Sequence, residues 1–402
     1  MRINRYLPFA LVYFFINALA LPFGLTYTAL LSPLLYWWVI TQRKTEILLP
    51  FFVCFVPYFI VHLVLGVDVK TYLVSILNYT FVYIFCQAFY TFLKVADDKE
   101  KIYRILLIIN FILCLIAVPI YFTSFNSIFW MSDAMTVGLE SSLRLKLFTY
   151  EPSYYAMLFT PLFFFFFMQL LLGQNKIKSW LLLLMLLLPY ILSFSIGTIG
   201  CILIACMTVY LFHFRKLTKK KTVLNIVMLG GIGLVVTLLI LWLFIPDNSL
   251  FLRLENIFSG KDTSGKGRTS DAFYLAMRIM DLKSHVFGVG AGQIKVIGAE
   301  IIRNFYFYPM DYTDIAIPNA AAETLAIFGW LGLSLRLLIE LFLFFYTKVW
   351  TNYFRFLLFI FIFVYQFTGS FVTNIAEYVI WILAFTNVFG EFDVKKAASY
   401  KL

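Results

Sequence analysis

The sequence contains few charged residues. Asp, Glu, Lys and Arg make up 13% of its 402 residues, about half the share that is usual in soluble proteins. Hydrophobic residues make up 62% of the chain, and its mean hydropathy is +0.89. A soluble protein needs more charged surface than this chain can supply. The composition therefore excludes a soluble enzyme, a disordered chain and a disulfide scaffold, and it predicts an all-α integral membrane protein.

Histidine and cysteine are also scarce. The three histidines, His62, His213 and His285, have no spacing typical of metal ligands, so we expect neither a metal site nor a cofactor. The five cysteines all fall within predicted membrane spans, which favours a packing role over disulfides or a thiol nucleophile.

Long apolar runs, in contrast, recur along the whole chain. A membrane-spanning helix needs ~20 mostly apolar residues, and an open sheet cannot satisfy its backbone in lipid. The runs predict about twelve spans, at residues 6–22, 25–40, 47–65, 72–93, 105–122, 154–172, 180–195, 197–214, 222–245, 320–346, 354–367 and 371–389.

The distribution of positive charge predicts the orientation of these spans. With the N-terminus in the cytoplasm, every short cytoplasmic segment is basic, and most of the 32 Lys and Arg residues lie on that side. The formal net charge of +11 is then largely topological and does not indicate nucleic-acid binding. We predict that both termini are cytoplasmic and that the first apolar run is an uncleaved span, not a signal peptide.

The predicted spans divide the chain into five parts. Residues 1–122 hold spans one to five, 123–153 form an outside loop, and 154–245 hold spans six to nine. Residues 246–319 form a large outside loop, and 320–402 hold the last three spans and a cytoplasmic tail. Because only outside loops are long, we expect the working face to be extracytoplasmic. ATP and nucleotide-sugars are absent there, so a group transfer would need a donor that arrives with the membrane.

The first outside loop ends with a candidate helix start. Pro152 and Ser153 are typical of the first turn of a helix, and they place Glu151 at the mouth of span six. A carboxylate at an apolar mouth would have a raised pKa and could serve as a general base. The alternative is a carboxylate that stabilises the helix N-terminus.

The large loop is predicted to contain an amphipathic helix. Apolar residues recur at helical spacing over 270–284, which favours a helix lying at the membrane interface. Arg268 precedes this helix and Arg278 lies within it. A guanidinium group can bind phosphate oxygens through two hydrogen bonds. Anionic lipid headgroups or a merely solvated face would explain these cations equally well.

Three further features suggest structural roles. Gly288, Gly290 and Gly292 are typical of a turn where backbone approaches backbone or ligand, not of a dinucleotide motif. Arg336 and Glu340 are spaced for an ion pair within span ten. Glu377 near the outer end of span twelve could belong to a site or bond a neighbouring helix, and we favour the structural role.

Four patches together resemble a known family. They are Arg144 to Ala156, with an arginine followed by Glu-Pro-Ser; Leu192 to Ser195; Arg253 to Arg268 with the following helix and Gly288-Val-Gly290; and Pro318-Asn319 with Leu325, Gly329 and Gly332. In this order, the patches resemble the O-antigen polymerase and O-antigen ligase superfamily of bacterial membrane enzymes. That resemblance implies a GT-C-like glycosyltransferase fold in the cytoplasmic membrane.

The resemblance also implies a reaction and roles for residues. A polymerase of this type transfers a growing glycan from undecaprenyl diphosphate to a lipid-linked repeat unit with inversion, and it needs no metal. By this resemblance Arg144, Arg268 and Arg278 would bind the diphosphate, and Glu151 would deprotonate the acceptor. Asn319 and Glu323, one helical turn apart, would orient sugar hydroxyls. Membrane lipids, a chain-length regulator and a flippase are the implied partners.

Two departures from the family pattern leave alternatives open. Ile196 and Pro318 stand where many members have arginine and histidine, and the missing histidine weighs against the ligase branch. A ligase that moves glycan to another acceptor remains the nearest alternative. A lipid-sugar flippase is a third, although no repeat of two six-span halves is apparent.

Grooves rich in aromatic residues, such as Phe163 to Phe167, would suit isoprenoid tails or plain lipid contact.

Overall fold

The computed structural model describes residues 5–16, 27–132, 143–174, 177–217, 255–256, 259, 263–312 and 315–397. The predicted ninth span, 222–245, and the loop cations Arg253 and Lys261 lie outside the described residues.

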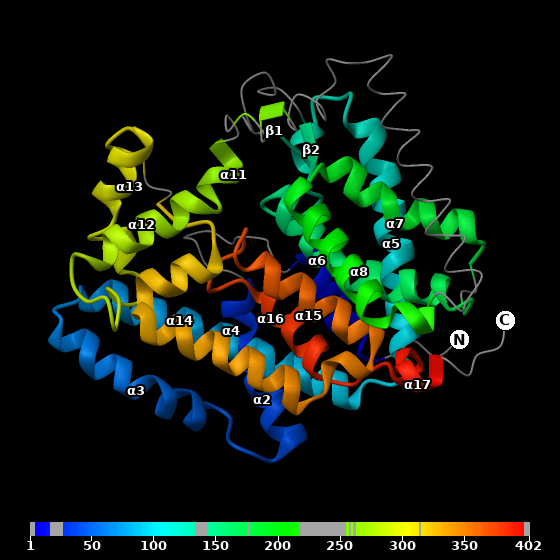
Figure 1. The fold of residues 1–402 in the computed structure, drawn as a ribbon, viewed down its shortest axis with the longest axis horizontal. Helices are drawn as coiled ribbons and strands as arrows, with labels where there is room; N and C mark the ends of the chain where they lie inside the picture. The colour runs from blue at the N-terminus through cyan, green and yellow to red at the C-terminus, as the bar shows by residue number, and fades with distance from the viewer. Residues whose placement is uncertain are drawn as a thin grey trace.

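Helices dominate the described part of the chain (Figure 1). The elements are α1 (Leu7–Leu11), η1 (Val12–Ile16), α2 (Tyr27–Arg43), α3 (Leu48–Val64), α4 (Val69–Val95), α5 (Lys99–Ile120), η3 (Asn126–Ile128), β1 (Trp130–Ser132), β2 (Leu143–Leu145), α6 (Pro152–Leu171), α7 (Ser179–Ser193), α8 (Ile196–Leu217), α11 (Thr263–Gly267), α12 (Ser270–Met280), η4 (Gln293–Lys295), α13 (Ala299–Tyr306), α14 (Ala320–Tyr346), η5 (Val349–Thr351), α15 (Tyr353–Tyr365), α16 (Ile375–Phe385), η6 (Gly390–Phe392) and α17 (Val394–Ala397).

Five of the described helices are long and apolar enough to cross a membrane: α4, α5, α6, α8 and α14. The bent pair α2 and α3, which meet at 119°, would make a sixth span if counted as one. Large apolar side chains on the outer faces of α2, α3, α8 and α14 are exposed, as expected where lipid replaces water. The fold is therefore compatible with an all-α membrane protein.

Three of the predicted spans form fully described helices that are shorter than a bilayer: α7, α15 and α16. The 13-residue α15 is about 20 Å long, against ~30 Å of hydrocarbon. For α15 and α16 the reason is local: Asn352 and Asn374 cap their N-termini with their side chains, and turns occupy 366–374. The apolar composition continues beyond these helix ends, so the count of twelve stays a prediction.

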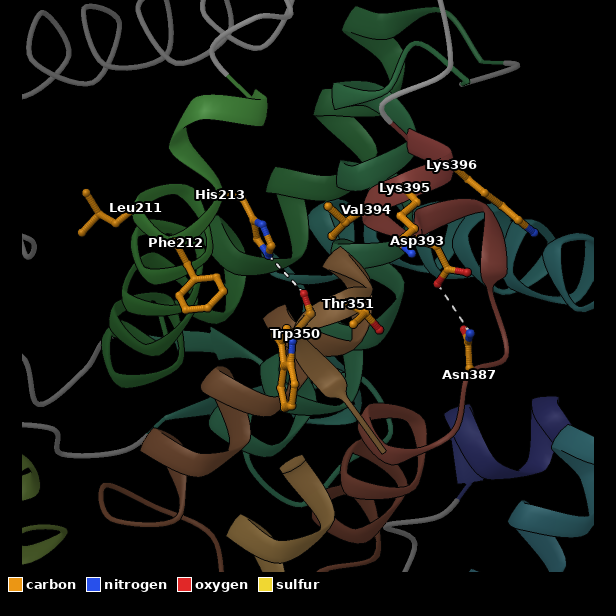
Figure 2. A pocket seen from close by; sticks show the side chains of 10 residues that line it. All are labelled: Leu211, Phe212, His213, Trp350, Thr351, Asn387, Asp393, Val394, Lys395 and Lys396. Atoms are coloured by element: carbon orange, nitrogen blue, oxygen red, sulfur yellow. Dashed lines mark hydrogen bonds between the residues drawn. The ribbon is translucent and has the colours of Figure 1, made fainter. Parts of the chain in front are cut away.

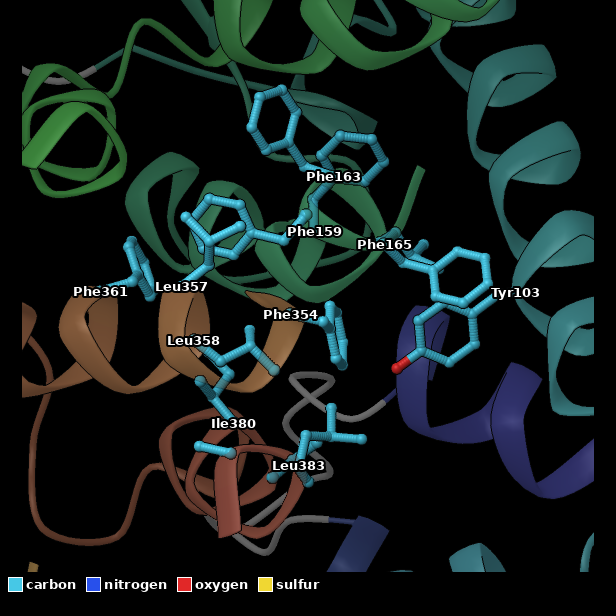
Figure 3. Close-up of a cluster of buried hydrophobic side chains, with 14 of the residues drawn as sticks. Tyr103, Phe159, Phe163, Phe165, Phe354, Leu357, Leu358, Phe361, Ile380 and Leu383 are labelled. Carbon is cyan, nitrogen blue, oxygen red and sulfur yellow. The ribbon is translucent and has the colours of Figure 1, made fainter. Parts of the chain in front are cut away.

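Helix α6 lies at the centre of the largest apolar cluster. Of its 20 residues, 19 are buried, and α7, α8, α15 and α16 pack around it. Phe163 to Phe166 are each at most 8% exposed, and the ring of Phe165 lies beside that of Tyr103 with centroids 4.9 Å apart (Figure 3). The expectation that this phenylalanine run faces isoprenoid or lipid is therefore wrong for Phe163 to Phe166, whereas Phe167 is only partly buried. The run packs the interior, since the C-terminal segment folds back over it.

A short sheet interrupts the all-α pattern. β1 and β2 pair antiparallel, with Trp130 opposite Leu145 and Met131 opposite Arg144. The side chains of Trp130 and Leu145 are buried against α5 and α7. This hairpin lies within the first predicted outside loop, and it fixes the backbone of Arg144.

Candidate functional site

A cavity of about 1220 Å³ opens where the two predicted outside loops meet the helical body. Its walls come from the first turns of α4, α6 and α14, from η4, from the segment 315–318 and from the connection between α15 and α16. Segments that are distant in the sequence thus converge on one hollow. Glu151, Arg268 and Glu323 are the predicted site residues that line it.

The start of α6 brings Glu151 into the cavity. Glu151 is the N-cap residue, with extended backbone angles, and Pro152 occupies the first helical position, where its missing amide costs no hydrogen bond. This confirms the predicted helix start. The Ser153 hydroxyl donates to the Glu151 carboxylate, so the first turn of α6 presents both groups on one side.

Arg268 meets this turn from the other loop. Its guanidinium group forms an ion pair with the carboxylate of Glu151, and Nη1 donates to the Ser153 hydroxyl at 3.3 Å. The side chains of Arg268 and Glu151 are 29% and 24% exposed, so both remain accessible from the cavity. The cluster therefore combines a planar cation, a carboxylate and a hydroxyl at one cavity wall.

The electrostatics of this pair correct one expectation. Burial alone would raise the pKa of Glu151, but the charge of Arg268, the hydrogen bonds from Ser153 and Arg268 and the charge of Arg144 outweigh it, and the pKa is lowered. Burial opposes the charge of Arg268, yet the pairing with Glu151 raises its pKa overall. The prediction of a raised pKa for Glu151 is wrong, because sequence alone did not reveal its partner.

Asn319 fixes Arg268 through the backbone. The Asn319 side-chain nitrogen donates to the carbonyl oxygens of Arg268 at 2.8 Å and of Phe367 at 2.7 Å, and its oxygen accepts from the amide of Ala322. The residue is fully buried, and both of its amide hydrogens are used. Asn319 therefore acts here as a helix cap and a support for Arg268, not as a group free to meet a sugar hydroxyl.

Glu323 lies one turn further along α14 and faces the cavity. One carboxylate oxygen accepts a hydrogen bond from the amide of Val372 at 2.6 Å. The side chain is half-buried, and it belongs to no ion pair within the described ranges. Its position thus resembles that of Glu151, but without a paired cation.

The other two predicted phosphate ligands do not line the cavity. Arg144 is 7% exposed, and its Nε donates to the carbonyl of Ser193 at 3.1 Å, so it lies behind Glu151 and acts on it through its charge. Arg278 is exposed on α12, outside the buried face that includes Ala272 and Leu275. The predicted amphipathic helix is confirmed, but its apolar face packs on α14.

Sequence reasoning missed the tyrosines and lysines of the cavity. Tyr residues contribute much of the lining, and the rings of two pairs lie close together at a tilt: Tyr150 with Tyr154 at 4.8 Å and Tyr308 with Tyr312 at 4.4 Å between centroids. Lys70 of α4 and Lys295 of η4 also line the cavity. A signal for these lysines existed, because both are basic residues in segments predicted to be outside. No such sequence signal identified the tyrosines, because Tyr is frequent throughout the chain.

The glycine-rich turn docks into a break in α14. Gly329 has φ +68° and interrupts the helix, and the carbonyl oxygens of Ala326 and Ile327 accept hydrogen bonds from the amides of Val289 and Gly290 at 2.9 and 3.0 Å. The amides that follow the break donate to the carbonyls of residues 285 and 286. The predicted close backbone approach is confirmed, and it satisfies backbone groups that lipid could not. The turn also holds η4 against the cavity.

The charged residues deeper in the helices form a structural network. Arg336 pairs with Glu340 at 3.2 Å, as predicted, and also with Glu377, which is 1% exposed. Gln366 donates to Glu340 at 2.7 Å and accepts from Arg336 at 2.8 Å. The network joins α14, α15 and α16, so the structural role favoured for Glu377 is confirmed.

A second cavity of about 980 Å³ lies near the C-terminal segment (Figure 2). His213 Nε2 donates to the carbonyl of Trp350 at 3.2 Å, and Asn387 contacts Asp393 at 3.5 Å. The dashed lines in Figure 2 mark these two hydrogen bonds, which pair the polar groups with one another. The first cavity, with an arginine and two carboxylates facing the hollow, is the better candidate site. Among the described residues, no group of three His, Cys, Asp or Glu could hold a metal ion.

Fold and site together define a helical, membrane-compatible protein with a cavity lined by charged groups and tyrosines. No family model, curated protein or solved structure matches the chain.

Proposed function

We propose that this protein is a polysaccharide polymerase of the cytoplasmic membrane of a bacterium. In this proposal twelve spans form a GT-C-like fold, both termini are cytoplasmic, and the cavity opens on the outer side. The substrates are undecaprenyl-diphosphate-linked oligosaccharides. The observation that carries the proposal is the position of Arg268, an accessible guanidinium in a cavity walled by tyrosines and carboxylates at the end of apolar helices.

The cavity suits an amphipathic substrate of this kind. A guanidinium group binds diphosphate oxygens through two hydrogen bonds, and the partial burial of the Arg268 side chain strengthens that interaction. Tyrosines offer flat apolar faces and hydroxyls, which match the two faces and the polar rim of a sugar ring. The apolar helices below would accommodate the isoprenoid tails.

The proposed reaction is a displacement at the anomeric carbon with inversion. The diphosphate is already a good leaving group, and Arg268 stabilises the negative charge that develops on it. One of the two carboxylates that line the cavity accepts the proton of the attacking hydroxyl. Arg144 lies behind Glu151 and acts through its positive charge. Arg278 does not reach the reacting groups.

The test is electrophoresis of the surface glycan from cells that lack the gene and from cells that carry variants. We expect Arg268→Ala to collapse the ladder to a single repeat unit at an unchanged amount of membrane-inserted protein. Arg268→Lys should restore the ladder only partly, because an ammonium group cannot form the planar double contact. Arg278→Ala is the matched control, since it removes an exposed arginine of the same loop, and it should keep the ladder.

Other results would redirect the assignment. A normal ladder in the Arg268→Ala strain would remove the diphosphate role. A complete lipid-linked ladder that never reaches its final acceptor would indicate a ligase, a function that Pro318 makes less favoured. Absence of the lipid-linked repeat unit from the outer face would indicate a flippase.

A further inference from the structure

We infer that Glu323, and not Glu151, is the general base that deprotonates the acceptor hydroxyl. This inference rests on the proposed function and names a further catalytic residue for that reaction. Within the described residues, these two side chains are the only carboxylates of the cavity wall. The choice between them follows from their partners.

Glu151 is poorly suited to take a proton while it pairs with Arg268. Its charge is balanced by the guanidinium group, and Ser153 donates to the same carboxylate oxygen that Arg268 contacts. Protonating this carboxylate would break the ion pair and leave a partly buried cation without its partner. Glu151 is therefore better suited to orient Arg268 than to accept a proton.

A hydrogen bond holds the Glu323 carboxylate in place, but within the described residues no ion pair neutralises its charge. The amide of Val372 fixes one oxygen at 2.6 Å, and the described residues provide no hydrogen-bond partner for the other oxygen. An acceptor hydroxyl in the cavity could therefore bond to this second oxygen. The charged groups whose fields reach Glu323 are Lys295 of η4, Arg336 of its own helix and Glu377 of α16.

The first turn of α14 links this base to the leaving-group cation. Asn319 caps the helix, and its side-chain nitrogen donates a hydrogen bond to the backbone carbonyl of Arg268. The backbone amide of Glu323 donates to the backbone carbonyl of Asn319 at 2.8 Å. Arg268 and Glu323 are thus positioned by the same buried residue. This arrangement would hold the base and the diphosphate at a fixed separation while the sugar passes between them.

The proposed displacement forms one glycosidic bond and transfers one proton. The acceptor oxygen forms a bond to the anomeric carbon while the bond from that carbon to the diphosphate oxygen breaks. The diphosphate leaves with the bonding electron pair beside Arg268, and the hydroxyl proton moves to the open oxygen of Glu323. The resulting carboxylic acid then returns the proton to water in the cavity.

The experiment uses purified full-length protein in liposomes with the lipid-linked repeat unit that accumulates in cells lacking the gene. Glu323→Gln keeps an oxygen that can accept from Val372, so the fold should survive, and we expect polymerisation to fall about 10² to 10⁴-fold. The acid limb of the pH profile should disappear in this variant. Glu300→Gln, at an exposed carboxylate of α13, is the matched control and should retain activity.

A second variant distinguishes a base from a merely structural carboxylate. Azide is a nucleophile that needs no deprotonation, so in Glu323→Ala it should consume the donor and yield an inverted glycosyl azide. Glu151→Ala should show no such rescue, because its defect lies in the cation that binds the diphosphate.

Failure of the Glu323 inference and failure of the proposed function would give different results. If Glu323→Gln polymerises within tenfold of Glu300→Gln, or if azide rescues Glu151→Ala and not Glu323→Ala, the inference is overturned while the proposed function stands. If the wild-type protein makes no polymer from the lipid-linked unit under any condition, the proposed function itself fails.

Discussion

Replacement of Gly329 by alanine would place a side-chain carbon inside the break of α14. Gly329 has φ +68° and ψ −170°, a conformation essentially restricted to glycine. The added Cβ would lie 2.2 Å from the carbonyl oxygen of Val286 and 2.6 Å from the amide nitrogen of Gly288. Because both are backbone atoms, no side chain can rotate away. The glycine-rich turn would have to leave the helix.

The loss of folding free energy follows from the backbone strain and from the hydrogen bonds that break when the turn leaves the helix. The backbone strain costs about 1 to 3 kcal/mol. The four backbone hydrogen bonds between residues 285–290 and 326–331 contribute about 0.5 to 1.5 kcal/mol each. We therefore expect Gly329→Ala to lower the free energy of unfolding by about 3 to 9 kcal/mol. Because the turn carries η4, Lys295 would also leave the cavity wall.

Thermal unfolding in detergent, followed with a thiol-reactive dye, measures this effect, since Cys114 and Cys201 are buried in the folded protein. Gly200→Ala is the control: it lies in α8, and a Cβ there would meet nothing within 4 Å. We expect a midpoint equal to or slightly above that of the wild type for the control and a markedly lower one for Gly329→Ala. Equal midpoints for the two variants would refute the assignment of Gly329 as the docking position.

Replacement of Glu151, Asn319 or Glu377 should each have a measurable effect on the fold. The pKa of Glu151 is lowered in the folded protein, so its pair with Arg268 stabilises the fold above the ordinary carboxyl value of 4.5, and this stabilisation is lost as the pH falls through the lower folded value. The difference in unfolding midpoint between the wild type and Glu151→Gln should therefore be constant from about pH 6 to 8 and vanish in acid; a difference that grows in acid would contradict the sign. Asn319→Ala leaves two carbonyl oxygens without their donor and should cost about 2 to 6 kcal/mol by thermal unfolding; an unchanged midpoint would show that water replaces the amide. Glu377→Ala breaks a buried pair with Arg336 and should cost about 3 to 5 kcal/mol, seen as a reduced yield of folded protein; a normal yield and midpoint would argue against a structural network.

Much of the helical layout could be predicted from the sequence, because apolar runs and capping residues act locally. The start of α6 at Pro152 and the amphipathic α12 are examples. Helix lengths were harder to predict. Near Asn374 the apolar composition extends through turns, so hydropathy could not show where α16 begins.

The candidate site was only partly predictable. The sequence predicts roles for Glu151, Arg268 and Glu323, and the structure places the three residues around one cavity. The sequence could not show which of them pair, because Arg268 and Glu151 are 117 positions apart. The same limit applies to Asn319, whose side chain was expected to meet substrate and instead supports Arg268.

The sequence by itself determined the class of environment, the positions of the helices and the glycine turn, since each depends on composition or on spacing within one or two helical turns. The tertiary structure decided which groups neutralise one another. It paired Glu151 with a cation, left Glu323 without one, turned Arg278 away from the cavity and enclosed the phenylalanine run of α6. The physical reason is that the charge state and exposure of a side chain depend on its neighbours in space, and those neighbours come from distant segments of the chain.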